Sequence, residues 1–222
     1  MKLSCINISV DDSLFIKNPE TTDLGKKIVE NGISLMVELG YEAFTFKKLG
    51  EAIGSNESSI YRYFESKHSL LLYFVNWYWS WIEYRLVLQT HALQDKQEKL
   101  KIAIKILTEK VTEDKQISFV DEAKLYKIIM CEATKAYYIK EVDQENKKGY
   151  YRAYKRVVQR VSDMVLEINP EFKFPHMLIS TIIEGSHNQY YFSEHLPSLT
   201  DVNNKNTNVV EFYTTLVQKV IS

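Results

Sequence analysis

The spacing of apolar residues is the feature that most constrains this chain. Long segments repeat them at intervals of three and four residues, and only 7 Gly and 4 Pro occur among 222 residues. A period of about 3.6 residues is typical of amphipathic α-helices. We therefore predict an all-α fold, and a hydrophobic content of 45% supplies a sizeable core in a chain of this length.

Charge and cysteine content exclude several classes of protein. Lys+Arg 28 against Asp+Glu 29 gives a formal net charge of -1, so any DNA binding must be local. Cys5 and Cys131 are too few for a disulfide framework and too far apart for a zinc motif, as expected in a reducing cytoplasm. The N-terminus lacks the continuous apolar core of a secretory signal, and no stretch reaches the ~20 apolar residues of a membrane helix.

The N-terminal part of the chain predicts three helices in succession. Apolar residues share one face from Asp23 to Leu39, and Gly40 is expected to end that helix as a left-handed cap. Thr45 is expected to cap a second helix that ends at Gly54, and Asn56 to cap a third, very short one. Two short helices joined by a three-residue turn match a helix-turn-helix.

The third short helix presents a polar face. Ile60 and Phe64 are four residues apart and are expected to point inward. A helical wheel places three polar side chains on the opposite side: Ser58, Ser59 and Arg62. Ser permits close approach to a major groove, Arg bonds guanine through two hydrogen bonds, and the flanking Tyr61 hydroxyl can reach phosphate. An ordinary solvated face is the alternative interpretation.

The surrounding sequence resembles a known family. "IVENGISLMVELGYEAFTFKKLGEAIGSNESSIYRYFESKHSLL" is similar to the DNA-binding region of the TetR family of bacterial regulators. The features in common are the join "LGYEAFT", the helix "LGEAIG", and the runs "SSIYRYF" and "SKHSLL". They lie within residues 28–72, about a fifth of the chain.

The resemblance implies a set of DNA-contacting residues. Lys47 would lie at the groove edge, Tyr61 and Lys67 would hold phosphates, and Lys67 follows a helix cap at Ser66. The whole implied set is Thr45, Lys47, Lys48, Glu57, Ser58, Ser59, Tyr61, Arg62, Tyr63 and Lys67. Between Leu24 and His68, however, six basic residues are balanced by six acidic ones, so the region has no net charge. Glu57 in particular cannot attract phosphate.

The chain is expected to have three parts. Residues 1–22 form a leader that contains only Lys2 and Lys17 as basic residues, whereas a minor-groove arm needs more, so we expect a flexible or loosely docked segment. Residues 23–68 form the helix-turn-helix DNA-binding domain. Residues 69–222 form a larger helical domain for ligand binding and dimerisation, as the resemblance implies.

Aromatic residues suggest a ligand cavity. The segment "SLLLYFVNWYWSWIEYRLVL" is apolar nearly all round, and Tyr and Trp bring polar tips that need partners when buried. We expect an apolar effector, with a ring or a long chain, between this helix and "LYKIIMCEATKAYY". The candidate ligand-binding residues are Trp77, Trp81, Tyr84, Tyr126, Met130, Thr134 and Tyr137. Ordinary core packing is the alternative.

Two late apolar stripes suggest a homodimer. The family's final long helices pair with a second subunit, and a palindromic operator needs two DNA-reading units. The candidate interface residues are Tyr154, Val157, Val161, Val165, Leu178, Ile182, Gly185 and Gln189. Packing within one subunit is the alternative.

No enzymatic motif is found. The His residues form no metal-binding pair, and neither a nucleophile elbow nor a phosphate-binding glycine loop occurs. We expect no catalytic residues, metal or cofactor. The sequence thus predicts a cytoplasmic, homodimeric TetR-type repressor of operator DNA that a small molecule releases. The other hypothesis is a helical ligand-binding or protein-interaction module whose DNA-binding region is weakened.

Overall fold

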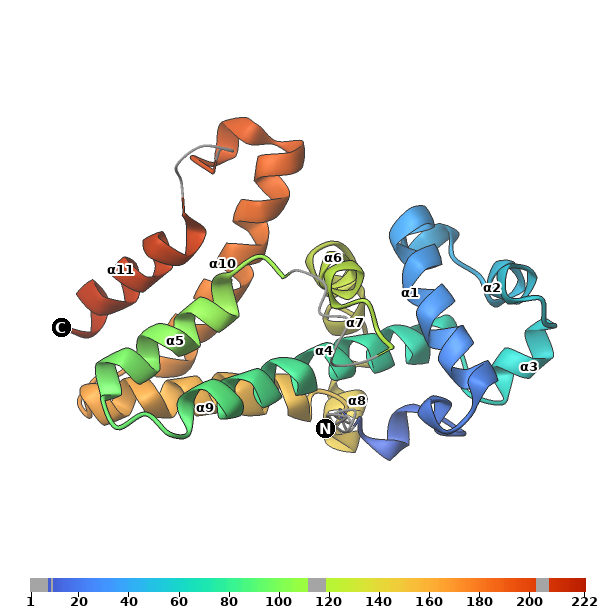
Figure 1. The fold of residues 1–222 in the computed structure, drawn as a ribbon, viewed down its shortest axis with the longest axis horizontal. Helices are drawn as coiled ribbons and strands as arrows, with labels where there is room; N and C mark the ends of the chain where they lie inside the picture. The colour runs from blue at the N-terminus through green and yellow to red at the C-terminus, as the bar shows by residue number, and fades with distance from the viewer. Residues whose placement is uncertain (1–7, 9, 112–118, 203–207) are drawn as a thin grey trace, which may run out of the picture. The chain divides into compact units, whose positions relative to one another are not determined.

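The computed structural model describes residues 8, 10–111, 119–202 and 208–222. All regular elements there are helical, which confirms the predicted fold class (Figure 1). The α-helices are α1 (Asp23–Ala43), α2 (Phe46–Ile53), α3 (Glu57–Tyr61), α4 (Lys67–Thr90), α5 (Lys96–Thr108), α6 (Glu122–Glu132), α7 (Thr134–Tyr137), α8 (Val142–Lys148), α9 (Arg152–Ile168), α10 (Pro175–His195) and α11 (Val209–Ile221). Three 3-10 helices are η1 (Asp12–Leu14), η2 (Pro19–Thr21) and η3 (Pro197–Leu199). Within the described ranges, no helix has both the length and the apolar character to cross a membrane.

The chain divides into two compact units. The first unit comprises residues 1–80 and 111–152, and the second comprises residues 81–110 and 153–222. Helix α4 contributes to both units, because the division falls after Ser80. The sequence placed a boundary after residue 68, whereas the structure groups α6, α7 and α8 with the N-terminal helices.

Side-chain caps set the N-terminal starts of α2, α3 and α4, as predicted. The Thr45 hydroxyl accepts a hydrogen bond from the Lys48 amide at 3.2 Å, and the Asn56 side-chain oxygen accepts one from the Ser59 amide at 2.9 Å. The Ser66 hydroxyl accepts from the Ser69 amide at 3.1 Å. Each bond satisfies one of the amides that a helix start leaves without an intrahelical acceptor.

Two glycines shape the turns of the three-helix region (residues 23–68). Gly54 ends α2 in the left-handed conformation, at φ 67° and ψ 36°, as predicted. Gly40 has φ 75° but ψ 160°, so α1 bends there and continues to Ala43 instead of ending at a left-handed cap. The side chain of Glu132 accepts a hydrogen bond from the Tyr41 amide at 3.1 Å, so a distant helix stabilises this bend. A short-range pattern could not predict that contact.

The described part of the leader, residues 8 and 10–22, packs within the first unit. Ile8, Val10, Leu14 and Pro19 are buried, and the Ile16 amide donates to the Tyr63 carbonyl at 2.8 Å. The leader therefore packs more tightly than its composition suggested, because apolar residues spaced along it contribute to the core.

The second unit has its own apolar core. Helix α5 contacts both α10 and α11, and α10 contacts α11 (Figure 1). Fully buried side chains come from α9 and α10: Val157, Val161, Val165, Ile179, Ile182 and Ile183. This core forms within a single chain.

Candidate nucleic-acid interface

Helices α2 and α3 form a helix-turn-helix. Ile60 and Phe64 are 0% exposed, so the predicted inward pair anchors α3 to the core. A Cβ atom at Gly50 would lie 2.8 Å from the Ser55 carbonyl oxygen, so α2 and the turn approach each other too closely for a side chain there. The buried pair and this close approach therefore determine which side of α3 is turned toward solvent.

The outer face of α3 is exposed and polar. Seven of the ten candidate DNA-contacting residues are exposed: Thr45, Lys47, Lys48, Glu57, Ser58, Tyr61 and Arg62. Arg62 forms no ion pair with any described residue, so its guanidinium group is available for an acceptor in solution. Lys48 Nζ donates to the Ala43 carbonyl at 2.8 Å.

Asn56 organises the serines of this face. Its side-chain oxygen accepts from the Ser58 hydroxyl at 2.8 Å and from the Ser59 hydroxyl at 2.7 Å, besides capping the helix. In this arrangement both hydroxyl protons are committed, and the free lone pairs can accept from base amino groups. Ser58 is exposed and Ser59 is half-buried.

Lys67 is held at the start of α4. Its ammonium group donates to the Tyr41 carbonyl at 3.0 Å and the Glu42 carbonyl at 3.3 Å, and lies 4.5 Å from the centre of the Tyr41 ring. The lysine is half-buried, beside the N-terminal turn that Ser66 caps. Amide dipoles and the ammonium group thus place positive charge at one point of the surface.

Tyr63 differs from the prediction that it faces DNA. Its side chain is 3% exposed, and its hydroxyl lies 2.7 Å from the Thr22 hydroxyl, which caps α1. Tyr63 follows α3 and lies beside the leader, so it packs the helix-turn-helix against α1. Tyr61, by contrast, is 47% exposed and stacks edge-on against Phe46 at 5.1 Å.

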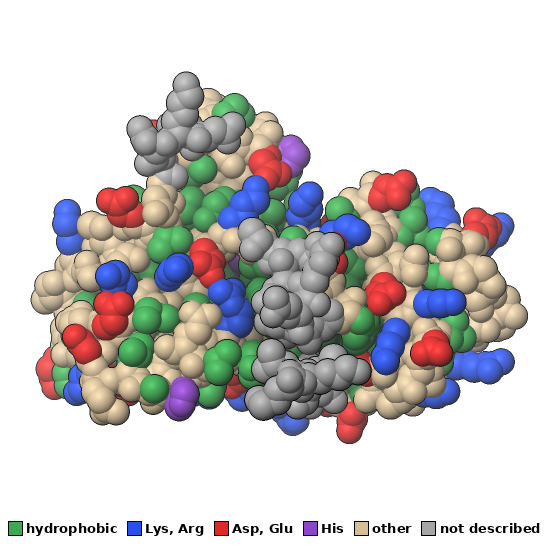
Figure 2. All heavy atoms as spheres, in the orientation of Figure 1, with side chains coloured by type: hydrophobic (Ala, Val, Ile, Leu, Met, Phe, Trp, Pro, Cys, Tyr) green, Lys and Arg blue, Asp and Glu red, His purple; other side chains and the backbone are tan. Residues whose placement is uncertain are grey.

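Charge is balanced across the interface. Figure 2 shows basic and acidic side chains interspersed over the part of the surface that contains α1 to α3. On the face shown in Figure 2, the equal numbers of basic and acidic residues are not gathered into a single basic patch. Local donors, rather than a broad field, must attract DNA.

A family comparison decides the class of this domain. The family model of bacterial regulatory proteins of the TetR family matches residues 28–74, which contain the helix-turn-helix just described. Residues 28–74 thus form a DNA-binding domain of the TetR type. No curated protein matches the chain in sequence.

Solved structures share the fold over most of the chain. FadR from Bacillus subtilis, in complex with stearoyl-CoA, has a TM-score of 0.63 at 15% identity and covers 88% of this chain and 97% of its own. AibR, in complex with isovaleryl-CoA and operator DNA, has a TM-score of 0.59 at 14% identity, with coverages of 87% and 97%. PfmR from Thermus thermophilus, a TetR family transcriptional regulator, has a TM-score of 0.58 at 13% identity, with coverages of 87% and 96%. The TetR fold thus extends beyond the matched domain.

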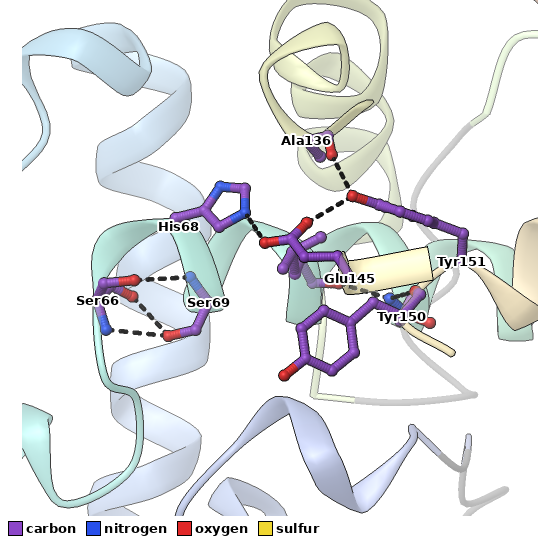
Figure 3. A network of polar contacts seen from close by, with 9 residues as sticks. Ser66, His68, Ser69, Ala136, Glu145, Tyr150 and Tyr151 are labelled. Carbon is purple, nitrogen blue, oxygen red and sulfur yellow. Dashed lines mark hydrogen bonds and ion pairs between the residues drawn. The ribbon is translucent and has the colours of Figure 1, made fainter. Parts of the chain in front are cut away.

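A polar network joins α4 to α8 next to the three-helix region (Figure 3). Glu145 is 9% exposed; its carboxylate lies 2.8 Å from His68 Nε2 and accepts from the Tyr151 hydroxyl at 2.5 Å. Burial, and then the hydrogen bond to Glu145, raise the pKa of Tyr151. Sequence reasoning missed this network, because His68 lies 77 residues before Glu145 and the members share no motif.

The structure divides the candidate ligand residues between the two units. Trp77 and Tyr126 are buried in the first unit at 2% exposure, Met130 and Tyr137 are half-buried there, and Thr134 is exposed. The Trp79 indole donates to the Tyr137 hydroxyl at 2.9 Å, so a residue outside the predicted stripe contacts this group. Because α4 is apolar on nearly all sides, its sequence could not indicate which of its tryptophans contacts Tyr137.

The remaining two ligand candidates, Trp81 and Tyr84, belong to the second unit. Trp81 is buried, and the Arg85 guanidinium lies 4.8 Å from the centre of its ring. A hollow of about 400 Å³ lies in this unit between α4, α5 and α9, and none of the seven candidates lines it. No group of His, Cys, Asp or Glu in the described residues is arranged to hold a metal ion.

The candidate dimer residues lie largely inside one subunit. Val157, Val161, Val165 and Ile182 are 0% exposed, which for these four favours the alternative of packing within one chain. A Cβ atom at Gly185 would lie 2.4 Å from the Tyr213 hydroxyl, so the close helix approach expected at this glycine is made by α11 of the same chain. The side chains of the other three, Tyr154, Leu178 and Gln189, are half-buried.

Proposed function

We propose that this protein is a cytoplasmic repressor of the TetR type that binds a palindromic operator as a homodimer and is released by a small apolar effector. The observation that carries the proposal is the outer face of α3. It combines an uncommitted Arg62 with Ser58 and Ser59, and it stands on a helix whose other side is fully buried. Such a rigid polar face fits the major groove.

Each group on this face has a specific role in the proposal. The Arg62 guanidinium donates two hydrogen bonds to guanine, and the serine hydroxyls accept from adenine or cytosine amino groups. Lys47, Tyr61 and Lys67, with the N-terminal amides of α4, hold phosphates and set the register. The phosphate contacts supply affinity for DNA of any sequence, whereas Arg62 supplies the preference for guanine at one base position.

Exposed apolar residues of α10 and α11 support dimerisation. Met177 is 66% exposed, Phe212 57% and Val220 44%, although large apolar side chains usually avoid water. A second copy is the occupant that a palindromic operator requires. We propose that these side chains, rather than the buried valines of α9, contact the partner. Phe212→Glu should yield a folded monomer in ultracentrifugation, and an unchanged dimer would place the interface elsewhere.

The effector is proposed to carry an apolar chain or ring. AibR and FadR, which share the fold, were solved with CoA thioesters of isovaleric and stearic acid. The many buried aromatic side chains around Trp77 and Tyr126 are compatible with an apolar guest. The effector releases DNA only to the extent that it binds the DNA-free conformation more tightly than the DNA-bound one.

Charge balance keeps a second candidate function open, a ligand-binding or protein-interaction module with weakened DNA binding. Two lysines of the three-helix region, Lys48 and Lys67, already donate to main-chain carbonyls. If those bonds persist near DNA, phosphate attraction is reduced.

Binding to DNA from beside the protein's own gene distinguishes the two functions. The repressor hypothesis predicts tighter binding to a fragment of that DNA than to random duplex, with affinity that falls as salt rises. Uncharged aromatic compounds, fatty acids and acyl-CoA thioesters should then be tested for thermal stabilisation and release of DNA. A true effector at ~100 times its Kd adds ~2.7 kcal/mol. Stabilisation without any DNA binding would favour the module.

A further inference from the structure

We propose that Lys17, in the leader before α1, is an additional phosphate contact for DNA. The inference rests on the proposed function and extends the DNA-binding surface beyond the helix-turn-helix. It starts from the finding that the leader is docked, so that a lysine within it has a defined place.

Two contacts fix the leader beside the end of α3, and a third fixes it against α1. The Ile16 amide donates to the Tyr63 carbonyl at 2.8 Å. The Thr22 hydroxyl lies 2.7 Å from the Tyr63 hydroxyl. A Cβ atom at Gly25 would lie 2.2 Å from the Pro19 carbonyl oxygen, so the leader packs against α1 where only a glycine leaves room.

The backbone contact at Tyr63 brings Lys17 to the C-terminal end of α3, where Arg62 is the C-terminal capping residue. The Lys17 ammonium group lies 5.4 Å from the centre of the Tyr63 ring, and Tyr63 directly follows Arg62. Lys17 is exposed and forms no ion pair with the described residues. An aromatic ring stabilises an exposed cation only weakly, so the group can exchange water for a phosphate oxygen.

Two of the three acidic residues of the leader are engaged elsewhere, and the third, Asp12, is exposed. Asp11 pairs with Arg152 at 3.4 Å, and Glu20 accepts from the Tyr73 hydroxyl at 3.2 Å. Burial raises the pKa of the Glu20 carboxyl, which reduces its negative charge at low pH. In a region where basic and acidic residues balance, one available lysine at the edge of α3 adds measurably to phosphate attraction.

The test measures how affinity depends on salt. Lys17→Gln should weaken binding to the DNA beside the gene and to random duplex by the same factor. It should also reduce the slope of log affinity against log salt by about 0.9 for each Lys17 engaged. Lys17→Arg should retain the slope. Lys140→Gln, which removes another exposed lysine between α7 and α8 in the same unit, should change neither quantity.

The outcomes separate this inference from the proposed function. Salt-dependent binding by the unchanged chain, with the same slope in Lys17→Gln, would overturn the role of Lys17 alone. A loss equal to that in Lys140→Gln would mean that net charge, and not position, accounts for the effect, and would also overturn it. No salt-dependent binding by the unchanged chain would overturn the proposed function and this inference with it.

Discussion

The three-helix region and the second unit differ in how their sequence patterns relate to their structure. In the three-helix region, polar residues at helix starts cap α2, α3 and α4 at the expected places. In the second unit, apolar stripes that resembled an interface between subunits are buried within one chain. A cap acts on an amide two or three residues away, whereas a stripe shows only that some partner covers it.

The difference shows which claims a periodic pattern supports. It establishes that a face is buried, and it leaves the identity of the covering element open. The clearest example is Val161, at 0% exposure inside α9. Exposed apolar side chains of that unit are found elsewhere, for example Met177 on α10 and Phe212 on α11.

The largest expected effect comes from a charge at Val161. Val161→Asp places an uncompensated carboxylate in a sealed core and should lower the free energy of unfolding by about 3–5 kcal/mol. Val87→Asp, at a valine of the same unit that is 40% exposed, should change it by less than about 0.5 kcal/mol. Urea unfolding measures both. A folded Val161→Asp protein that only dissociates would restore α9 as the interface.

The next effect concerns acid stability of the second unit. Burial lowers the pKa of His187 from 6.5 to about 4, so the unfolded chain binds more protons between those values. The free energy of unfolding should therefore fall as pH falls from about 6.5 to 4, by up to about 3 kcal/mol.

Urea unfolding from pH 7 to 4 checks this prediction against a variant that cannot be protonated. His187→Gln should lose that component of the pH dependence, whatever its stability at neutral pH. The same pH dependence in both proteins would show that His187 does not remain neutral in the folded state.

The smallest of the three effects tests the capped helices. Asn56→Ala removes the acceptor for one amide and two hydroxyls, and should destabilise the first unit by about 1 kcal/mol. Asn188→Ala, at an exposed position within α10, should cost less than about 0.5 kcal/mol. Urea unfolding compares the two. Equal effects would mean that the Asn56 cap contributes no particular stability.

Much of the DNA-binding region could be predicted from sequence because its determinants are local. The inward pair Ile60 and Phe64, the glycine at Gly54 and the capping residues each act over a few positions. The exposed Arg62 followed from the same helical wheel. The family resemblance added the roles of the flanking lysines.

The remaining features depend on contacts over long distances in sequence. Tyr63 is buried because Thr22 and the leader cover it, and α1 continues beyond Gly40 because Glu132 bonds the next amide. Similarly, the aromatic run of α4 is apolar all round, so no sequence pattern could predict the hydrogen bond from the Trp79 indole to the Tyr137 hydroxyl. Each of these needs a partner that only the fold supplies.

The most direct test of the account is a complete base-substitution scan of the operator with the unchanged protein and with Arg62→Ala. Binding to the DNA beside the gene and to every single-base variant of it is measured at one fixed salt concentration. The account predicts that Arg62→Ala weakens binding to the native sequence by ~1 to 3 kcal/mol and relaxes preference at one base position in each half-site. An equal loss on all sequences, random duplex included, would contradict base reading by α3.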